Sequence, residues 1–170
     1  MLFGTDGIRG EVSNSPTDDE DAVSQLIGQR YISTRLMRLV GEALTRIVEI
    51  GSNVIIGWDN RPDNPDLVSS LTTGLHLGGC TVSHGGVCAT PALHNALLET
   101  KSALGCMITA SHNPVTDSGI KVFDSSGFKT SPELEREISE LVIQLAAEER
   151  EVDLIHQQEL SEPDSHFNAD

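Results

Sequence analysis

Residues 104–123 read LGCMITASHNPVTDSGIKVF and combine two apolar runs with a polar segment between them. The first run, residues 104–108, is too short for a helix and predicts a buried strand. The second run, residues 120–123, alternates in character as a half-buried strand does. The intervening residues 109–119 are rich in Ser, Asn, Pro and Gly, which favour turns. This stretch therefore predicts a polar loop held between two strands.

Strands and helices are expected to alternate on both sides of this stretch. Short apolar runs at residues 54–56 and 80–82 predict two more strands. Residues 11–22 are polar and predict a solvated loop, and Gly85-Gly86 and residues 124–127 predict turns. Apolar side chains at helical spacing predict four helices, at residues 31–48, 67–75, 90–97 and 130–145.

This pattern predicts an α/β fold, a three-layer α/β/α sandwich with a mainly parallel, mixed sheet. Such sheets bind ligands at loops beyond the carboxyl ends of their strands. The loops expected there are residues 57–65, 83–90 and 109–119.

The 170 residues carry 26 acidic and 11 basic side chains, which gives a formal net charge of −15. Residues 132–170 account for 12 of the acids and only 2 of the bases. We therefore expect one domain over residues 1–150 and an acidic, disordered tail over residues 151–170. The acidity argues against nucleic acid or an anionic membrane as a partner. No apolar run could span a bilayer and no signal peptide is present, so we expect a cytoplasmic protein.

Metal-binding and disulfide patterns are absent from the sequence. Cys80, Cys88 and Cys106 lack the spacing of a zinc site or a disulfide framework, and their apolar neighbours favour buried thiols. The six histidines lack metal-ligand spacing, and the acidic run at residues 18–21 lacks the spacing of a calcium loop.

The polar loop Thr109-Ala110-Ser111-His112-Asn113-Pro114 is the strongest candidate site. The Ser111 hydroxyl could act as a nucleophile if a neighbour manages its proton and cations neutralise the transferred group. His112 is adjacent, and Lys121 follows ten residues later, where it could pair with phosphate or move a proton. The alternative is an ordinary turn in which His112 bonds only to the backbone.

Two further clusters contain an arginine. Gly4-Thr5-Asp6-Gly7-Ile8-Arg9-Gly10 could hold Arg9 toward an anion, or it could be a flexible N-terminus with an incidental arginine. Asp59 and Arg61, after the strand at 54–56, could brace a site or bind phosphate. We favour the bracing role, with a solvated surface pair as the alternative.

The motifs T-A-S-H-N-P and G-T-D-G-I-R-G, with lysine ten residues after the serine, resemble the α-D-phosphohexomutase superfamily. The resemblance runs from about Phe3 to residue 150 and covers the first, N-terminal domain of that superfamily. The opening motif is most similar to the phosphoglucosamine mutase branch.

This resemblance implies a phosphosugar mutase that moves a phosphoryl group between the 6- and 1-positions of a hexose or hexosamine phosphate. Ser111 would be the phosphoserine, Lys121 the general acid/base, and Arg9 and His112 supports for the phosphoryl group. An oxygen of the phosphoserine would be one ligand of Mg²⁺. The partners implied are hexose or hexosamine monophosphates and bisphosphates, with glucosamine phosphate expected as substrate. The expected supporting residues are Thr109, Asn113, Asp59 and Arg61.

The sequence also departs from the superfamily pattern. Members have four domains, and the Asp-Gly-Asp-x-Asp-Arg metal loop of the second domain does not occur here. We therefore expect a fragment or truncated product with little activity alone, which could still meet the missing mutase domains as partners. Trp58 stands where a basic residue is common, and residues 62–66 read Pro-Asp-Asn-Pro-Asp in place of a Ser-Gly type stretch.

Two alternative functions account for parts of the sequence. A non-catalytic module that binds sugar phosphates or a protein partner is the main alternative, although a binder has no need for the Ser111 nucleophile. A hydrolase using Ser111 and His112 is disfavoured, because the G-x-S-x-G elbow is absent and adjacent residues suit a triad poorly.

Overall fold

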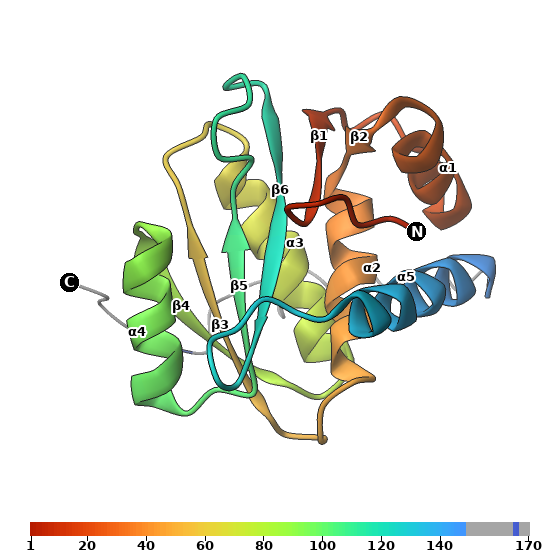
Figure 1. Ribbon diagram of the computed structural model, residues 1–170. Helices are drawn as coiled ribbons and strands as arrows, with labels where there is room; N and C mark the ends of the chain where they lie inside the picture. The colour runs from red at the N-terminus through yellow and green to blue at the C-terminus, as the bar shows by residue number, and fades with distance from the viewer. Residues whose placement is uncertain (149–164, 167–170) are drawn as a thin grey trace.

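The computed structural model describes residues 1–148 together with the backbone of residues 165 and 166. Within these residues, seven strands form one sheet in the order β2-β1-β6-β5-β3-β4-β7 (Figure 1). β6 pairs antiparallel with β1 and with β5, and the other neighbouring strands are parallel, so the sheet is mixed. The strands are β1 (Ile8–Val12), β2 (Tyr31–Ile32), β3 (Asn53–Trp58), β4 (Thr81–Val87), β5 (Leu104–Ile108), β6 (Asp117–Asp124) and β7 (Ser165–His166).

Helices cover both faces of this sheet, which confirms the predicted α/β/α sandwich. Among the described helices, only α4 lies on one side of the sheet, where it packs on β3 and β5 (Figure 1). The other helices pack with one another over the opposite face. The described helices are α1 (Asp19–Gln29), α2 (Thr34–Thr45), α3 (Asn64–Leu77), α4 (Thr90–Thr100) and α5 (Pro132–Ala147).

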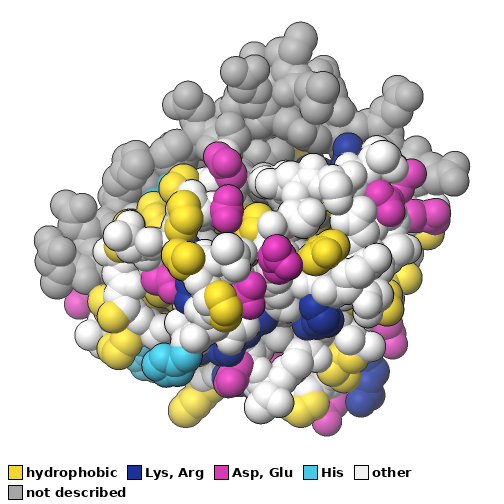
Figure 2. Space-filling view, turned by 90° about the horizontal axis from the view of Figure 1, so that it is seen from above, with side chains coloured by type: hydrophobic (Ala, Val, Ile, Leu, Met, Phe, Trp, Pro, Cys, Tyr) yellow, Lys and Arg dark blue, Asp and Glu magenta, His cyan; other side chains and the backbone are white. Residues whose placement is uncertain are grey.

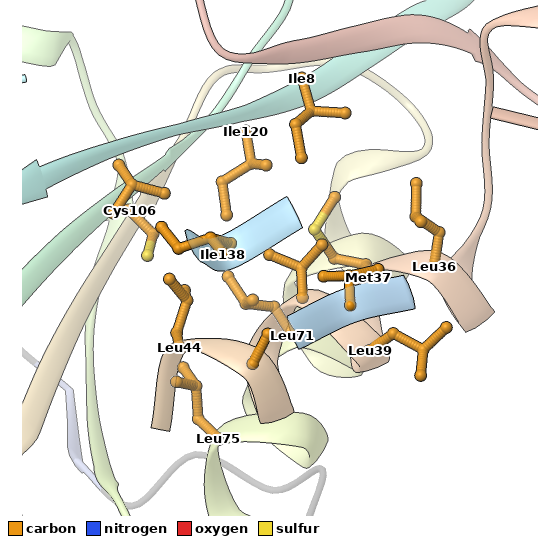
Figure 3. Packing of buried hydrophobic residues seen from close by; sticks show 14 of the residues in the cluster. Ile8, Leu36, Met37, Leu39, Leu44, Leu71, Leu75, Cys106, Ile120 and Ile138 are labelled. Carbon is orange, nitrogen blue, oxygen red and sulfur yellow. The ribbon is translucent and has the colours of Figure 1, made fainter. Parts of the chain in front are cut away.

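The core has two unequal parts because successive side chains of a strand point to opposite faces. The larger part joins the strands to α1, α2, α3 and α5, and Figure 3 shows Ile8 and Ile120 facing helical side chains such as Met37. The smaller part lies under α4 and contains Ile55 and Met107. The alternation therefore places Lys121, between Ile120 and Val122, on the α4 side of the sheet.

The predicted solvated loop at residues 11–22 is wrong at both ends. Residues 8–12 form β1, and α1 begins at Asp19, capped by the Asp18 carboxylate, which accepts from the Asp21 N–H at 2.8 Å. The Asp19 side chain is buried and accepts from Arg38 at 2.5 Å, so this acidic run contributes to the interior. Its burial depends on a partner nineteen residues away, which local composition cannot reveal.

Smaller differences concern element ends. The helix expected from residue 31 begins at Thr34, because Tyr31–Ile32 pairs with β1 and the Ser33 hydroxyl caps α2. Gly85-Gly86 lies within β4 and does not form a turn. The tail expected at residues 151–170 lies outside the described residues, except that Ser165 and His166 pair with β4.

In the part of the chain that the structure describes, no helix combines the length and the apolar character needed to cross a membrane.

Candidate functional site

Residues 109–116, here called the serine loop, connect β5 to β6 at the carboxyl end of β5. Its base is closed by the Thr109 N–H, which donates to the Gly119 carbonyl at 3.0 Å. Ser111 has φ 53°, in the left-handed region that side chains other than glycine rarely adopt. Its N–H donates to the Thr109 hydroxyl at 2.9 Å, which helps to hold this conformation. Strained backbone of this kind is typical of functional sites.

Arg9 is the cation in contact with the Ser111 hydroxyl. Its Nη2 lies 3.1 Å from Ser111 Oγ, although the two residues are 102 positions apart. Asp6 also holds the guanidinium: its carbonyl accepts from Arg9 Nε at 3.1 Å, and its carboxylate lies 3.6 Å from Nη2. A group bonded to Ser111 Oγ would therefore lie next to a positive charge.

Glycines let β1 approach β6 closely enough to make this contact. A Cβ on Gly7, which has φ 87°, would lie 2.2 Å from the Ile120 carbonyl oxygen. A Cβ on Gly119 would lie 1.9 Å from the Ile8 carbonyl oxygen. The Gly-rich opening segment is thus ordered by close backbone packing against β6, which differs from a flexible N-terminus.

Arg61 holds the crest of the serine loop. Its Nη1 donates to the carbonyls of Pro114 at 2.6 Å and Asp117 at 3.0 Å. Its Nη2 donates to the carbonyls of Ser111 at 2.7 Å and Asn113 at 3.2 Å. Since Nε donates to Asp59, all five N–H groups of the guanidinium are engaged. This arrangement matches the bracing role and leaves no donor for a phosphate.

Asp59 connects this brace to the base of the loop. Its Oδ2 accepts from the Thr109 hydroxyl at 2.6 Å and from Arg61 Nε at 3.2 Å. Its Oδ1 accepts from Asn64 Nδ2 at 2.6 Å. Asn64, the first residue of α3, is completely buried. Sequence reasoning did not select it, and the only signal was its place in the unusual Pro-Asp-Asn-Pro-Asp stretch.

The side chains of the remaining predicted site residues make no hydrogen bond to Ser111 among the residues that the structure describes. Lys121 is half-buried beside Met107 on the α4 side of the sheet, and His112 is exposed. Neither side chain has a hydrogen-bond partner among the residues that the structure describes. Asn113 Nδ2 donates to Asp117 Oδ2 at 3.2 Å and so braces the loop. Figure 2, which views this end from above, shows Lys and Arg side chains interspersed with Asp and Glu side chains.

The described residues do not fit a magnesium site built from protein ligands alone. No group of three or more His, Cys, Asp or Glu side chains is placed to hold a metal in residues 1–148. Both carboxylate oxygens of Asp59, which bonds to Thr109 at the loop base, already accept hydrogen bonds.

The cysteine side chains take no part in the hydrogen bonds described above for the serine loop. Cys80 and Cys106 are buried as expected, and Cys88 is half-buried. Burial, with a smaller contribution from neighbouring Cys80, raises the pKa of the Cys106 thiol to about 12. A thiol with this pKa is a poor nucleophile near neutral pH.

Comparison with known proteins identifies relatives of this domain. The family model for phosphoglucomutase/phosphomannomutase, alpha/beta/alpha domain I, matches residues 1–149. Phosphoglucosamine mutase of Bdellovibrio bacteriovorus is 40% identical over 143 residues, which cover 84% of this chain and 30% of that protein. The phosphoglucosamine mutase of Parasynechococcus marenigrum is 39% identical over 131 residues, covering 77% of this chain and 25% of that protein.

Solved structures agree with these sequence matches. A structure from Thermus thermophilus, whose description names a phosphomannomutase, superposes with a TM-score of 0.67 at 29% identity. The match covers 82% of this chain and 29% of that chain. This chain thus spans between a quarter and a third of the length of the relatives that it matches.

Proposed function

Because this chain belongs to the phosphoglucomutase/phosphomannomutase family, we propose that its serine loop carries a phosphoryl group on Ser111 in a phosphosugar mutase reaction. The observation that supports this role most strongly is the 3.1 Å contact between Ser111 Oγ and the Arg9 guanidinium. A loose phosphoryl transition state needs positioning and positive charge more than covalent assistance. The serine loop offers both at one hydroxyl.

In the proposed reaction, a hydroxyl oxygen of a hexose monophosphate attacks the phosphorus atom of the phosphoserine. The phosphoryl group then moves from Ser111 Oγ to the sugar. The P–O bond to Ser111 breaks and leaves its electron pair on Ser111 Oγ beside the Arg9 guanidinium. The P–O bond to the sugar forms, and the sugar hydroxyl gives up its proton. In our proposal, Lys121 Nζ is the general base that accepts that proton. The resulting bisphosphate then returns its other phosphoryl group to Ser111, and Lys121 returns the proton to the sugar oxygen. Arg9 stabilises the charge on the transferred group in both directions.

The substrate that we propose is glucosamine phosphate, exchanged between its 6- and 1-phosphates. Support comes from the curated relatives, which are named phosphoglucosamine mutases. The opening motif G-T-D-G-I-R-G points to the same branch. Sugar recognition and the remaining ligands of Mg²⁺, of which the phosphate would supply one, are assigned to groups outside residues 1–148. We propose that this chain alone turns over slowly, with other mutase domains as its partners.

The test is uptake of phosphate by the purified chain from glucosamine 1,6-bisphosphate or glucose 1,6-bisphosphate. Intact mass should show one added phosphoryl group in the wild-type chain and none in Ser111→Ala. Ser126→Ala, which changes an exposed serine in the turn after β6, is the matched control and should be labelled like the wild type. Tight binding of the sugar phosphate in calorimetry without transfer, even with the other mutase domains supplied, would favour a binding module instead.

A further inference from the structure

The Asn64 side chain forms several hydrogen bonds to groups at the base of the serine loop. Helix α3, which begins at Asn64, needs none of these bonds for its own backbone. Its Nδ2 donates to the Asp59 carbonyl at 3.0 Å, to Asp59 Oδ1 at 2.6 Å and to the Ile108 carbonyl at 3.1 Å. Its Oδ1 accepts from the Ser118 hydroxyl at 2.5 Å. Both Asn64 and Ser118 are completely buried. The side chain thus joins the ends of β3, β5 and the start of β6.

These bonds lie at the two points where the serine loop enters and leaves the sheet. Ile108 is the last residue of β5, directly before Thr109. Ser118 pairs with Gly10 and is followed by Gly119, which pairs with Arg9. Asn64 therefore contacts β5, which leads into the loop that carries Ser111, and also β6, which pairs with the strand that carries Arg9.

Capping of α3 does not explain this side chain. The N-cap of α3 is Asp63, which makes no side-chain cap bond, and Asn64 directs its amide toward the sheet. A smaller residue at this position would leave the Ile108 carbonyl and one Asp59 oxygen each short of a buried donor. Buried polar groups that lose a partner favour local rearrangement of the backbone.

We propose that Asn64 is a positioning residue for phosphoryl transfer, which keeps Ser111 Oγ and the Arg9 guanidinium within hydrogen-bonding distance. Arg61 holds the crest of the loop, whereas Asn64 holds its base, and Asp59 connects the two. This inference rests on the proposed function for its catalytic consequence. Its structural part, the ordering of the loop by Asn64, stands independently.

Amide hydrogen exchange measured by NMR on the full chain tests the structural part. In Asn64→Ala, the amides of Thr109, Ser111 and Asn113 should exchange about 10-fold faster or more, while amides in α5 keep their rates. The matched control is Asn60→Ala, because Asn60 lies in the same connection, is exposed and has no side-chain bond among the described residues. Ser118→Ala removes a single bond to Asn64 and should give a smaller change at the same amides.

Ser118→Ala also keeps the test decisive if Asn64→Ala fails to fold. Faster exchange confined to the serine loop supports the proposal in either variant. Equal acceleration throughout the molecule, or unchanged exchange in the loop, would overturn it, since a purely stabilising residue acts on every amide through global unfolding.

The rate at which Ser111 takes up phosphate from glucose 1,6-bisphosphate tests the catalytic part. Asn64→Ala should lower the single-turnover rate about 100-fold, with little change in the concentration that gives the half-maximal rate. Asn60→Ala should leave both quantities unchanged. An unchanged rate in Asn64→Ala would refute the positioning role. If the wild-type chain takes up no phosphate, either alone or with the other mutase domains supplied, the proposed function fails, and the exchange data still decide whether Asn64 orders the loop.

Discussion

Ser111 combines a nucleophilic hydroxyl with a backbone conformation that costs free energy. Its φ of 53° is maintained by bonds from both directions, the Thr109 hydroxyl at its N–H and the Arg61 guanidinium at its carbonyl. A left-handed residue other than glycine costs on the order of 1 kcal/mol. The hydrogen bonds of the surrounding loop offset this cost. As a result, Ser111 Oγ lies within hydrogen-bonding distance of Arg9.

This strain predicts different effects of two substitutions on stability. Ser111→Gly and Ser111→Ala should both lose phosphate uptake, but the glycine variant should be more stable than the alanine variant by about 1 kcal/mol, since glycine accepts positive φ. Urea unfolding, followed by the fluorescence of the single tryptophan, Trp58, measures the difference. Equal stability of the two variants would show that the left-handed conformation carries no cost.

Arg61 makes a second prediction at the residue scale. Arg61→Lys should lower the free energy of unfolding by about 3 kcal/mol, because one ammonium cannot replace a planar group that donates to five acceptors. Arg46→Lys is the control, since Arg46 is exposed and has no side-chain bond among the described residues. Arg61→Lys should also slow phosphate uptake on Ser111. Wild-type stability and uptake in Arg61→Lys would argue against the brace.

At the scale of elements, helices α2 and α3 approach closely through glycines. A Cβ on Gly74 of α3 would lie 2.1 Å from the Arg38 carbonyl oxygen of α2, and a Cβ on Gly41 would lie 2.5 Å from the Leu71 carbonyl oxygen. This close packing fixes α3, and the first residue of α3 is Asn64. The helix pair thus determines where the base of the serine loop is held.

The same substitution should therefore have opposite effects in two helices. Gly74→Ala should destabilise the protein by about 2 kcal/mol through overpacking. Gly28→Ala in α1, where a Cβ would meet nothing within 4 Å, should stabilise it by about 0.5 kcal/mol through helix propensity. Thermal unfolding of both variants measures the pair. Stabilisation by Gly74→Ala would contradict the close approach of α2 and α3.

Elements with local signals could be predicted from the sequence, whereas those that depend on distant partners could not. The cap of α5 was predictable, because Ser131 accepts from the Leu134 N–H only three residues away. β1 was missed because Ile8 pairs with Ile120, far along the chain. Asn64 was missed for the same reason, since its acceptor Ile108 and its donor Ser118 lie 44 and 54 residues away.

At the scale of the whole molecule, burial of the Cys106 thiol makes the free energy of unfolding fall as the pH becomes alkaline. The pKa of Cys106 is raised from 9.0 to about 12 in the folded state, chiefly by burial, so the unfolded chain loses this proton first. Its contribution to stability is complete below pH 9 and is lost as pH rises from 9 toward 12. Cys106→Ala should therefore unfold with a weaker pH dependence than the wild type above pH 9, in urea titrations at several pH values. The same slope in both proteins would contradict the burial effect.

The acidic surplus of the chain also takes on a narrower meaning at this scale. Of the formal net charge of −15, two-thirds belongs to residues 132–170, which begin at α5. Arg9 and Arg61 both donate hydrogen bonds to Ser111, in a chain with only 11 basic residues. We infer that the limited positive charge is concentrated where a phosphoryl group would be transferred.

The most direct measurement is the location and fate of phosphate on the chain. After incubation with glucosamine 1,6-bisphosphate, peptide mapping by mass spectrometry should place one phosphoryl group on Ser111, and addition of glucosamine 6-phosphate should remove it and regenerate the bisphosphate. Phosphate found on another residue, or none at all in the chain with or without the other mutase domains, would contradict the role of Ser111 as phosphoryl carrier.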